Sequence, residues 1–197
     1  MLELDDMNMP TLRKYASEFC KDKNWEDIFT EAMHLYTTEN NSKQMYFSIF
    51  LLGEISSYKM EALDFLRCKV SQNPDWRAQE VLAKAFDIFC SKTGYENALP
   101  VINEWLTDKN ENVRRAVTEG LRVWTSKPFF KENPEEAINV LSNLKSDPSE
   151  YVRTSVGNAI SDISKKYQEL VKNELNNWNC KEPFVLYTYQ IASRHMI

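Results

Sequence analysis

Glycine is scarce in this sequence, with four residues in a chain of 197. Gly-rich phosphate loops, Rossmann turns, nucleophile elbows and many-stranded barrels all need glycine where φ is positive. The scarcity therefore argues against each of these and favours a protein built from helices. It is well below the level of about 7% that is typical of globular proteins.

Metal-ligating and disulfide-forming residues are also few and scattered. There are two histidines, and the four cysteines lie far apart with no CxxC pair: Cys20, Cys68, Cys90 and Cys180. A zinc site or a Cys–His nucleophile pair is not expected from this pattern. We predict no metal and no cofactor, and we interpret the cysteines as small apolar residues of helices.

Long apolar runs and a basic leader are absent. The longest apolar stretch, residues 46–52, is about a third of the roughly 20 residues that span a bilayer. The acidic N-terminus does not resemble a signal peptide, so we expect a soluble, cytoplasmic protein of bacterial type with access to the nucleoid and no membrane contact. The net charge of −5 argues against bulk coating of nucleic acid, but it leaves a local basic patch open.

What the sequence does contain is helical periodicity along nearly its whole length. Asn73-Pro74 and Asn133-Pro134 combine a capping side chain with proline, as helix starts do. We predict an all-α fold with helices at 10–20, 24–38, 42–55, 58–71, 75–92, 95–107, 112–125, 135–146, 149–166, 168–178 and 182–194.

These helices repeat at an offset of 39 residues. Asp108 aligns with Asp147, and Val113-Arg114 aligns with Val152-Arg153. A unit of about 40 residues with Asp before its second helix and Val-Arg inside it is typical of HEAT repeats. We predict one domain, 1–197, in which about five helix pairs stack into an α-α superhelical solenoid with one concave face.

Polar stripes on three second helices are candidates to line that face. Helix 149–166 carries Tyr151, Ser155, Asn158 and Asp162 at helical spacing, opposite an apolar stripe. The preceding repeats contribute the following residues at comparable positions: Arg115, Glu119 and Arg122, and before them Trp76 and Glu80.

A basic segment interrupts this acidic chain between Arg114 and Lys131. It has five basic residues against one acid, and Trp124, Phe129 and Phe130 lie among them. Cations interleaved with planar rings suit a sugar-phosphate backbone or an unstacked base. The alternative is a solvated loop whose aromatic rings fill the seam between repeats.

Two segments carry a family resemblance. ENVRRAVTEG (111–120) and SDPSEYVRTSVGNAISDISK (146–165) resemble the HEAT-like alkylpurine DNA glycosylases of the AlkC and AlkD superfamily, most strongly over about 75–175. The resemblance implies a monomer that acts on alkylated double-stranded DNA without a cofactor. Its substrates would be cationic N-alkylated purines such as 3-methyladenine or 7-methylguanine.

The chemistry that the resemblance implies is coherent. A cationic base is already a good leaving group, so no general acid is required. The rate gain would come from carboxylates and ring faces that stabilise an oxocarbenium-like sugar. The AlkD-type pattern maps an aromatic and an acid one turn apart onto Trp76 and Glu80, with Glu in place of the usual Asp, and its backbone-binding arginine onto Arg115. Its second aromatic falls on Asn158, which is a departure.

The run around Asn158 is closer to the AlkC pattern, which maps acidic site residues onto Glu119 and Asp162 and an aromatic onto Trp124. The catalytic candidates are therefore Glu80, Glu119 and Asp162, and the substrate-binding candidates are Trp76, Arg115, Trp124 and Asn158. The candidates for the DNA backbone are Arg114, Arg122, Lys127, Lys131 and Arg153.

Each candidate also has a structural interpretation. Arg114 and Arg153 are repeat-consensus arginines that often bond a neighbouring repeat, and Glu119 has the spacing for an intrahelical ion pair with a nearby arginine. Gly120 and Gly157 flank the candidates, and we interpret them as close approaches of a neighbouring helix or of DNA. Two other functions stay open, namely a member of the superfamily that binds DNA without excision and a HEAT scaffold that binds protein.

Overall fold

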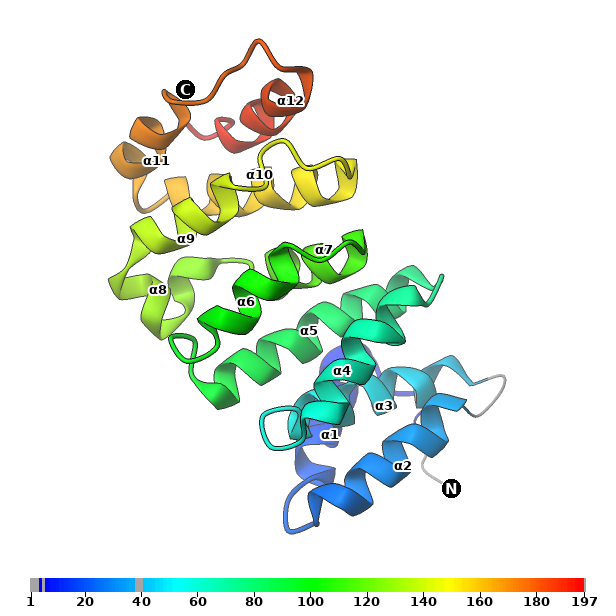
Figure 1. Cartoon of the computed structure of the whole chain (residues 1–197). Coiled ribbons are helices and arrows are strands. Elements are labelled where there is room, and N and C mark those ends of the chain that lie inside the picture. Colours follow the sequence, from blue (N-terminus) through cyan, green and yellow to red (C-terminus); the bar gives the residue numbers. More distant parts are fainter. Residues whose placement is uncertain (1–3, 5, 38–40, 197) are drawn as a thin grey trace. The chain divides into compact units, whose positions relative to one another are not determined.

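The computed structural model describes residues 4, 6–37 and 41–196 (Figure 1). Those residues form twelve α-helices and two short 3₁₀ turns, with no β-strand among them. None of the described helices is both long and apolar enough to cross a membrane. The chain divides into two compact units, 1–94 and 95–197, and the single domain predicted for 1–197 stays a prediction.

The N-terminal unit is organised around one buried helix. Its helices are α1 (Met9–Phe19), α2 (Trp25–Thr37), α3 (Ser42–Ile55), α4 (Met60–Cys68) and α5 (Trp76–Thr93), with a 3₁₀ turn at Val70–Gln72. Helices α1, α2, α4 and α5 all pack on α3. Every residue of α3 from Tyr46 to Ile55 is buried, which explains why this segment is apolar on all sides apart from Ser48 and Glu54.

Helix α5 is fixed at its start and along its middle. Asp75 is its N-cap and accepts a hydrogen bond from the Arg77 backbone N–H at 2.9 Å, and it also accepts one from the Tyr46 hydroxyl. Burial, together with that bond to Asp75, raises the pKa of Tyr46 to about 12. Farther along, a Cβ at Gly53 would lie 2.9 Å from the Cα of Ala85, so only glycine allows α3 and α5 to cross this closely.

The C-terminal unit is built from helix pairs. Its helices are α6 (Leu99–Leu106), α7 (Glu111–Gly120), α8 (Pro128–Glu132), α9 (Pro134–Ser142), α10 (Glu150–Ser164), α11 (Gln168–Leu175) and α12 (Pro183–Ala192), with a 3₁₀ turn at Trp124–Ser126. Helix α10 packs between α7 and α12, and the first helices α9 and α11 also contact each other. The predicted all-α helical-repeat class is confirmed.

The 39-residue repeat reappears in the hydrogen bonds. Asp108 accepts from the Asn110 N–H at 2.8 Å, and Asp147 accepts from the Ser149 N–H at the same distance. The arginine six residues after each aspartate donates through Nη1 to the aspartate's own carbonyl, at 2.8 Å for Arg114 and 2.6 Å for Arg153. The Asp…Arg spacing therefore closes the loop before each second helix.

Most helix ends differ from the predicted ranges by a few residues, and the largest differences lie after α7. The helix predicted for 112–125 ends at Gly120, because Val123 adopts a left-handed conformation with φ of 56° and turns the chain. A β-branched residue rarely adopts this conformation, and no glycine or asparagine marks the turn in the sequence. The short helix α8 was not predicted, and the predicted end of the helix at 24–38 lies outside the described residues.

Candidate nucleic-acid interface

The face formed by α7 and α10, which we call the α7/α10 face, carries five of the twelve candidate residues, namely Arg115, Glu119, Arg122, Asn158 and Asp162. Arg115 stacks over the ring of Tyr151, with its guanidinium carbon 5.0 Å from the ring centroid. Arg122, just beyond α7, reaches Asp162 on α10, with Nε and Oδ2 3.2 Å apart. The two polar stripes that we predicted on these helices therefore lie side by side, except that Ser155 is buried within α10 and does not reach the face.

Two carboxylates on this face are largely covered by protein. The side chain of Glu119 is 17% exposed and that of Asp162 is 12% exposed. Arg122 contacts both, since its Nη1 lies 3.8 Å from Oε2 of Glu119. Lys165 adds a second cation, with Nζ 2.7 Å from Oδ1 of Asp162.

These cations determine the charge state of Asp162. Burial acts to raise its pKa, but the hydrogen bonds from Lys165 and Arg122 outweigh burial, so the pKa lies below the usual value. Asp162 is therefore a carboxylate at neutral pH. Such a group can stabilise a developing positive charge nearby once its own ion pairs loosen.

Asn158 lies one helical turn before Asp162 and is half-buried. The neighbouring Gly157 faces the other way, toward α12. A Cβ at Gly157 would lie 2.7 Å from Cβ of Ile191 and 3.1 Å from the carbonyl oxygen of Thr188. Of our two interpretations of this glycine, the close approach of a neighbouring helix is confirmed, and this contact accounts for Gly157 without DNA.

Trp124 lies in the core of the C-terminal unit. Its side chain is fully buried, its ring packs against Phe130 at 4.9 Å, and its Nε1 points to the Thr118 carbonyl oxygen at 3.5 Å. A buried ring has no face for a ligand, so this position does not fit the prediction that Trp124 contacts the substrate. The physical reason is the turn at Val123, which directs the following residues inward.

Arg114 and Arg153 are also internal. Arg114 makes a bidentate ion pair with Asp147 of the next repeat, with both N–O distances 2.7 Å. Arg153 is 5% exposed and is covered by the ring of Phe184, 4.1 Å from its guanidinium carbon. Arg114 bonds a neighbouring repeat, as the structural interpretation predicts, whereas Arg153 donates to the loop of its own repeat and packs against rings of α12. Neither arginine is available to a DNA phosphate in this structure.

The other predicted phosphate ligands, Lys127 and Lys131, lie just before and within α8. Lys127 is half-buried, with its Nζ 5.7 Å from the ring centroid of Tyr95. Lys131 is exposed, and its carbonyl accepts a hydrogen bond from Tyr167 at 3.1 Å. Their ammonium groups stay candidates for phosphate contacts.

Trp76 and Glu80 belong to the N-terminal unit and lie one turn apart on α5. Trp76 is 61% exposed, and the guanidinium carbon of Arg77 lies over its ring, 4.6 Å from the ring centroid. Glu80 is half-buried. The predicted spacing of an aromatic and an acid on one helix is therefore present.

Two members of the α7/α10 face had no predicted site role, although Tyr151 belongs to the predicted polar stripe. Tyr151 is 64% exposed and supports Arg115, and Lys165 holds Asp162. Lys165 could have been found from its spacing of three residues from Asp162. The pairing of Tyr151 with Arg115 depends on the contact between α7 and α10, which no local pattern reveals.

Within the part of the chain that the structure describes, no three His, Cys, Asp or Glu side chains gather to hold a metal ion.

Comparison with known proteins gives consistent matches. Residues 6–188 match the family described as DNA alkylation repair enzyme. The crystal structure of AlkD2 from Streptococcus mutans is 46% identical with a TM-score of 0.92, and the match covers 97% of this chain and 91% of that one.

Two further matches are more partial. The alkylpurine DNA glycosylase AlkC of Pseudomonas fluorescens, solved with DNA containing an abasic site analog, has 22% identity and a TM-score of 0.55 over 94% of this chain and 64% of that one, which supports the fold alone. YhaZ of Bacillus subtilis is 33% identical over 106 residues, which is 52% of this chain and 30% of the relative.

Proposed function

Because the chain belongs to the DNA alkylation repair enzyme family, we propose that its α7/α10 face binds double-stranded DNA and that the protein excises cationic N-alkylated purines, such as 3-methyladenine or 7-methylguanine, from it. The observation that carries the proposal is the pair of covered carboxylates, Glu119 and Asp162, held beside Arg122 on a face that also presents Arg115.

The cations of the face supply the affinity for DNA. Arg115 is oriented by its contact with Tyr151, which lowers the entropy lost when its planar guanidinium meets a phosphate. Arg122 is 44% exposed and makes one ion pair at 3.2 Å and one at 3.8 Å, so it can exchange a carboxylate for a phosphate. That exchange would leave Asp162 facing the sugar with only Lys165 as its partner.

Excision then needs little covalent chemistry from the protein. The bond between C1′ and the purine nitrogen breaks, and its electron pair leaves with the base and cancels the base's positive charge. The sugar becomes oxocarbenium-like and is stabilised by the ionised Asp162. Water adds to C1′, and its proton passes to the Glu119 carboxylate.

The test is base release from methylated duplex DNA under single-turnover conditions, with the freed purines separated by chromatography. We expect release by the native protein and a loss of about 10²-fold or more in Asp162→Asn and Glu119→Gln, the scale found when a group that stabilises the transition state is removed. Glu169→Gln, an exposed acid on α11, is the matched control and should behave as the native protein does. Absence of release by the native protein, with DNA binding intact, would refute excision.

A second function, DNA binding without excision, is favoured by one specific observation. Asp162 already makes ion pairs with Arg122 and Lys165, so its charge is largely neutralised in the free protein. If the protein has this second function, the native protein binds methylated duplex DNA and releases no base from it.

Both functions require affinity that falls steeply with salt, by a slope of about 0.9 per phosphate contact on logarithmic axes. We expect Arg115→Gln to reduce that slope and Lys172→Gln, an exposed lysine on α11, to leave it unchanged. Binding that does not depend on salt would exclude this face as a phosphate-binding surface.

A further inference from the structure

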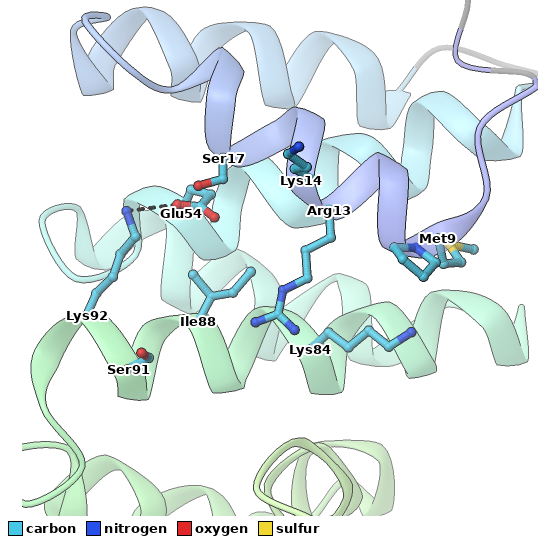
Figure 2. Close-up of a pocket in the computed structure, with 10 residues that line it drawn as sticks. Met9, Arg13, Lys14, Ser17, Glu54, Lys84, Ile88, Ser91 and Lys92 are labelled. Carbon is cyan, nitrogen blue, oxygen red and sulfur yellow. Dashed lines mark ion pairs between the residues drawn. The ribbon is translucent and has the colours of Figure 1, made fainter. Parts of the chain in front are cut away.

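A cleft opens in the N-terminal unit, between two of the helices that cover α3. Helices α1 and α5 both pack on α3, and the space left between them has a volume of about 520 Å³. The α5 side chains that line it, Lys84, Ile88 and Lys92, are spaced at four residues and so share one face of the helix. Arg13 and Ser17 line it from α1 with the same spacing (Figure 2).

The lining of the cleft is strongly cationic for a protein of net charge −5. Its basic residues are Arg13, Lys14, Lys84 and Lys92, and its single carboxylate is Glu54. Glu54 is 6% exposed and is committed to Lys92, with the two charged groups 2.8 Å apart. Arg13 makes only a distant ion pair with Asp87, at 3.7 Å. The excess of positive charge favours an anionic ligand.

The two ends of the cleft differ in chemistry. Arg13 and Lys84 lie at one end, beside Met9 (Figure 2). The Glu54–Lys92 ion pair and the Ser17 hydroxyl lie at the other end, and Ile88 lies between. The cleft thus offers a guanidinium and an ammonium for a phosphate, an apolar centre for a ring, and polar groups beyond it. Its volume is within the range of about 300–1,000 Å³ that is usual for small-molecule sites.

We propose that this cleft binds a nucleotide. The phosphate lies against Arg13 and Lys84, because a guanidinium can contact two phosphate oxygens and an ammonium adds charge. The base packs on Ile88 at the centre of the cleft, and its polar edge meets Ser17 and the Glu54–Lys92 pair at the far end. A free nucleoside monophosphate and the 5′-phosphorylated end of a DNA strand share this chemistry.

The test is calorimetric titration of the full chain with adenosine and guanosine monophosphates, the corresponding nucleosides and inorganic phosphate. We expect saturable binding of a monophosphate and at least about tenfold weaker binding of its nucleoside and of phosphate, since each lacks half of the contacts. Arg13→Gln and Lys84→Gln, on separate helices, should each weaken binding about tenfold. Lys69→Gln, an exposed lysine of the same unit outside the cleft, should leave it unchanged.

Competition identifies the source of the ligand. A fluorescent nucleotide is bound first and then displaced. If free monophosphate displaces it and oligonucleotides do not, the cleft takes a free nucleotide. If a 5′-phosphorylated oligonucleotide displaces it and the unphosphorylated form does not, the cleft takes a DNA end. Equal binding of nucleoside and nucleotide, undiminished binding by Arg13→Gln and Lys84→Gln, or no saturable binding would each overturn the proposal. Because no measurement uses methylated DNA, failure here is distinct from failure of excision.

Discussion

The buried ion pair between Arg114 and Asp147 allows a quantitative test of how the repeats are joined. The side chains are 9% and 3% exposed, and the pair is bidentate at 2.7 Å. The hydrogen bond to Asp147 raises the pKa of Arg114 and so holds its charge. Replacing Arg114 with Met would leave Asp147 buried with the Ser149 N–H as its remaining partner, so we expect a loss of about 3–5 kcal/mol in the free energy of unfolding.

Arg153 provides a matched control, because it is the same repeat position 39 residues later. It makes the same carbonyl bonds through Nη1, but it faces the rings of Phe184 and Tyr187 rather than a carboxylate. Arg153→Met strands no buried anion and should cost less, about 1.5–3 kcal/mol, the scale of hydrogen bonds from a charged donor to neutral carbonyls.

Urea denaturation followed by circular dichroism measures both losses. Adding Asp147→Asn to Arg114→Met removes the stranded charge but retains the bond to Ser149, so the double variant should recover about 2 kcal/mol. If Arg153→Met costs as much as Arg114→Met, or if the double variant recovers less than about 0.5 kcal/mol, then the ion pair is not what joins these two repeats.

Three further predictions concern packing and titration. Gly157→Ala should lower the free energy of unfolding by about 1–2 kcal/mol in the same urea assay, because overpacking against Ile191 exceeds the gain of about 1 kcal/mol in helix propensity. The pKa of Asp162 is lower in the folded protein than in the unfolded chain, where it is about 3.9. Its ionised form therefore stabilises the fold above about pH 3.9, and this stability is lost as the pH falls through the folded pKa. Asp162→Asn should flatten the acid limb of a curve of unfolding free energy against pH. Burial and, less strongly, Glu54 raise the pKa of Cys20 to about 12, so its thiol should react with a disulfide reagent at pH 8 far more slowly than that of exposed Cys68. Because the thiol stays protonated in the folded state, the free energy of unfolding should fall as the pH rises from about 9 toward 12. Rapid labelling of both cysteines would contradict the burial of Cys20.

The sequence predicted the fold class and the register of the repeat well because both depend on local signals. Asp108 and Asp147 mark equivalent loops, and the arginine six residues after each makes the same bonds. The identical motif did not reveal that Arg114 meets Asp147 whereas Arg153 meets Phe184, because the partner comes from the next repeat. Such contacts depend on what stacks above each helix.

The candidate site was predicted less completely, and Trp124 shows why. Periodicity continued the helix past Gly120, which placed Trp124 beside the surface stripe. The left-handed Val123 instead turns the chain and buries the ring. The cleft between α1 and α5 could not be predicted from the sequence either, because Arg13 and Lys84 are 71 positions apart. Each of them taken singly looks like an ordinary solvated basic residue.

The burial of α3 on all sides also has a consequence for synthesis. The ten residues from Tyr46 to Ile55 are covered partly by α4 and α5, which emerge from the ribosome after them. At roughly 5–20 residues per second, the 38 residues from Ile55 to the end of α5 at Thr93 take roughly 2–8 s to add. During that interval the nascent chain exposes an apolar helix, which is a substrate for chaperones, and α5 is the segment whose arrival ends the exposure.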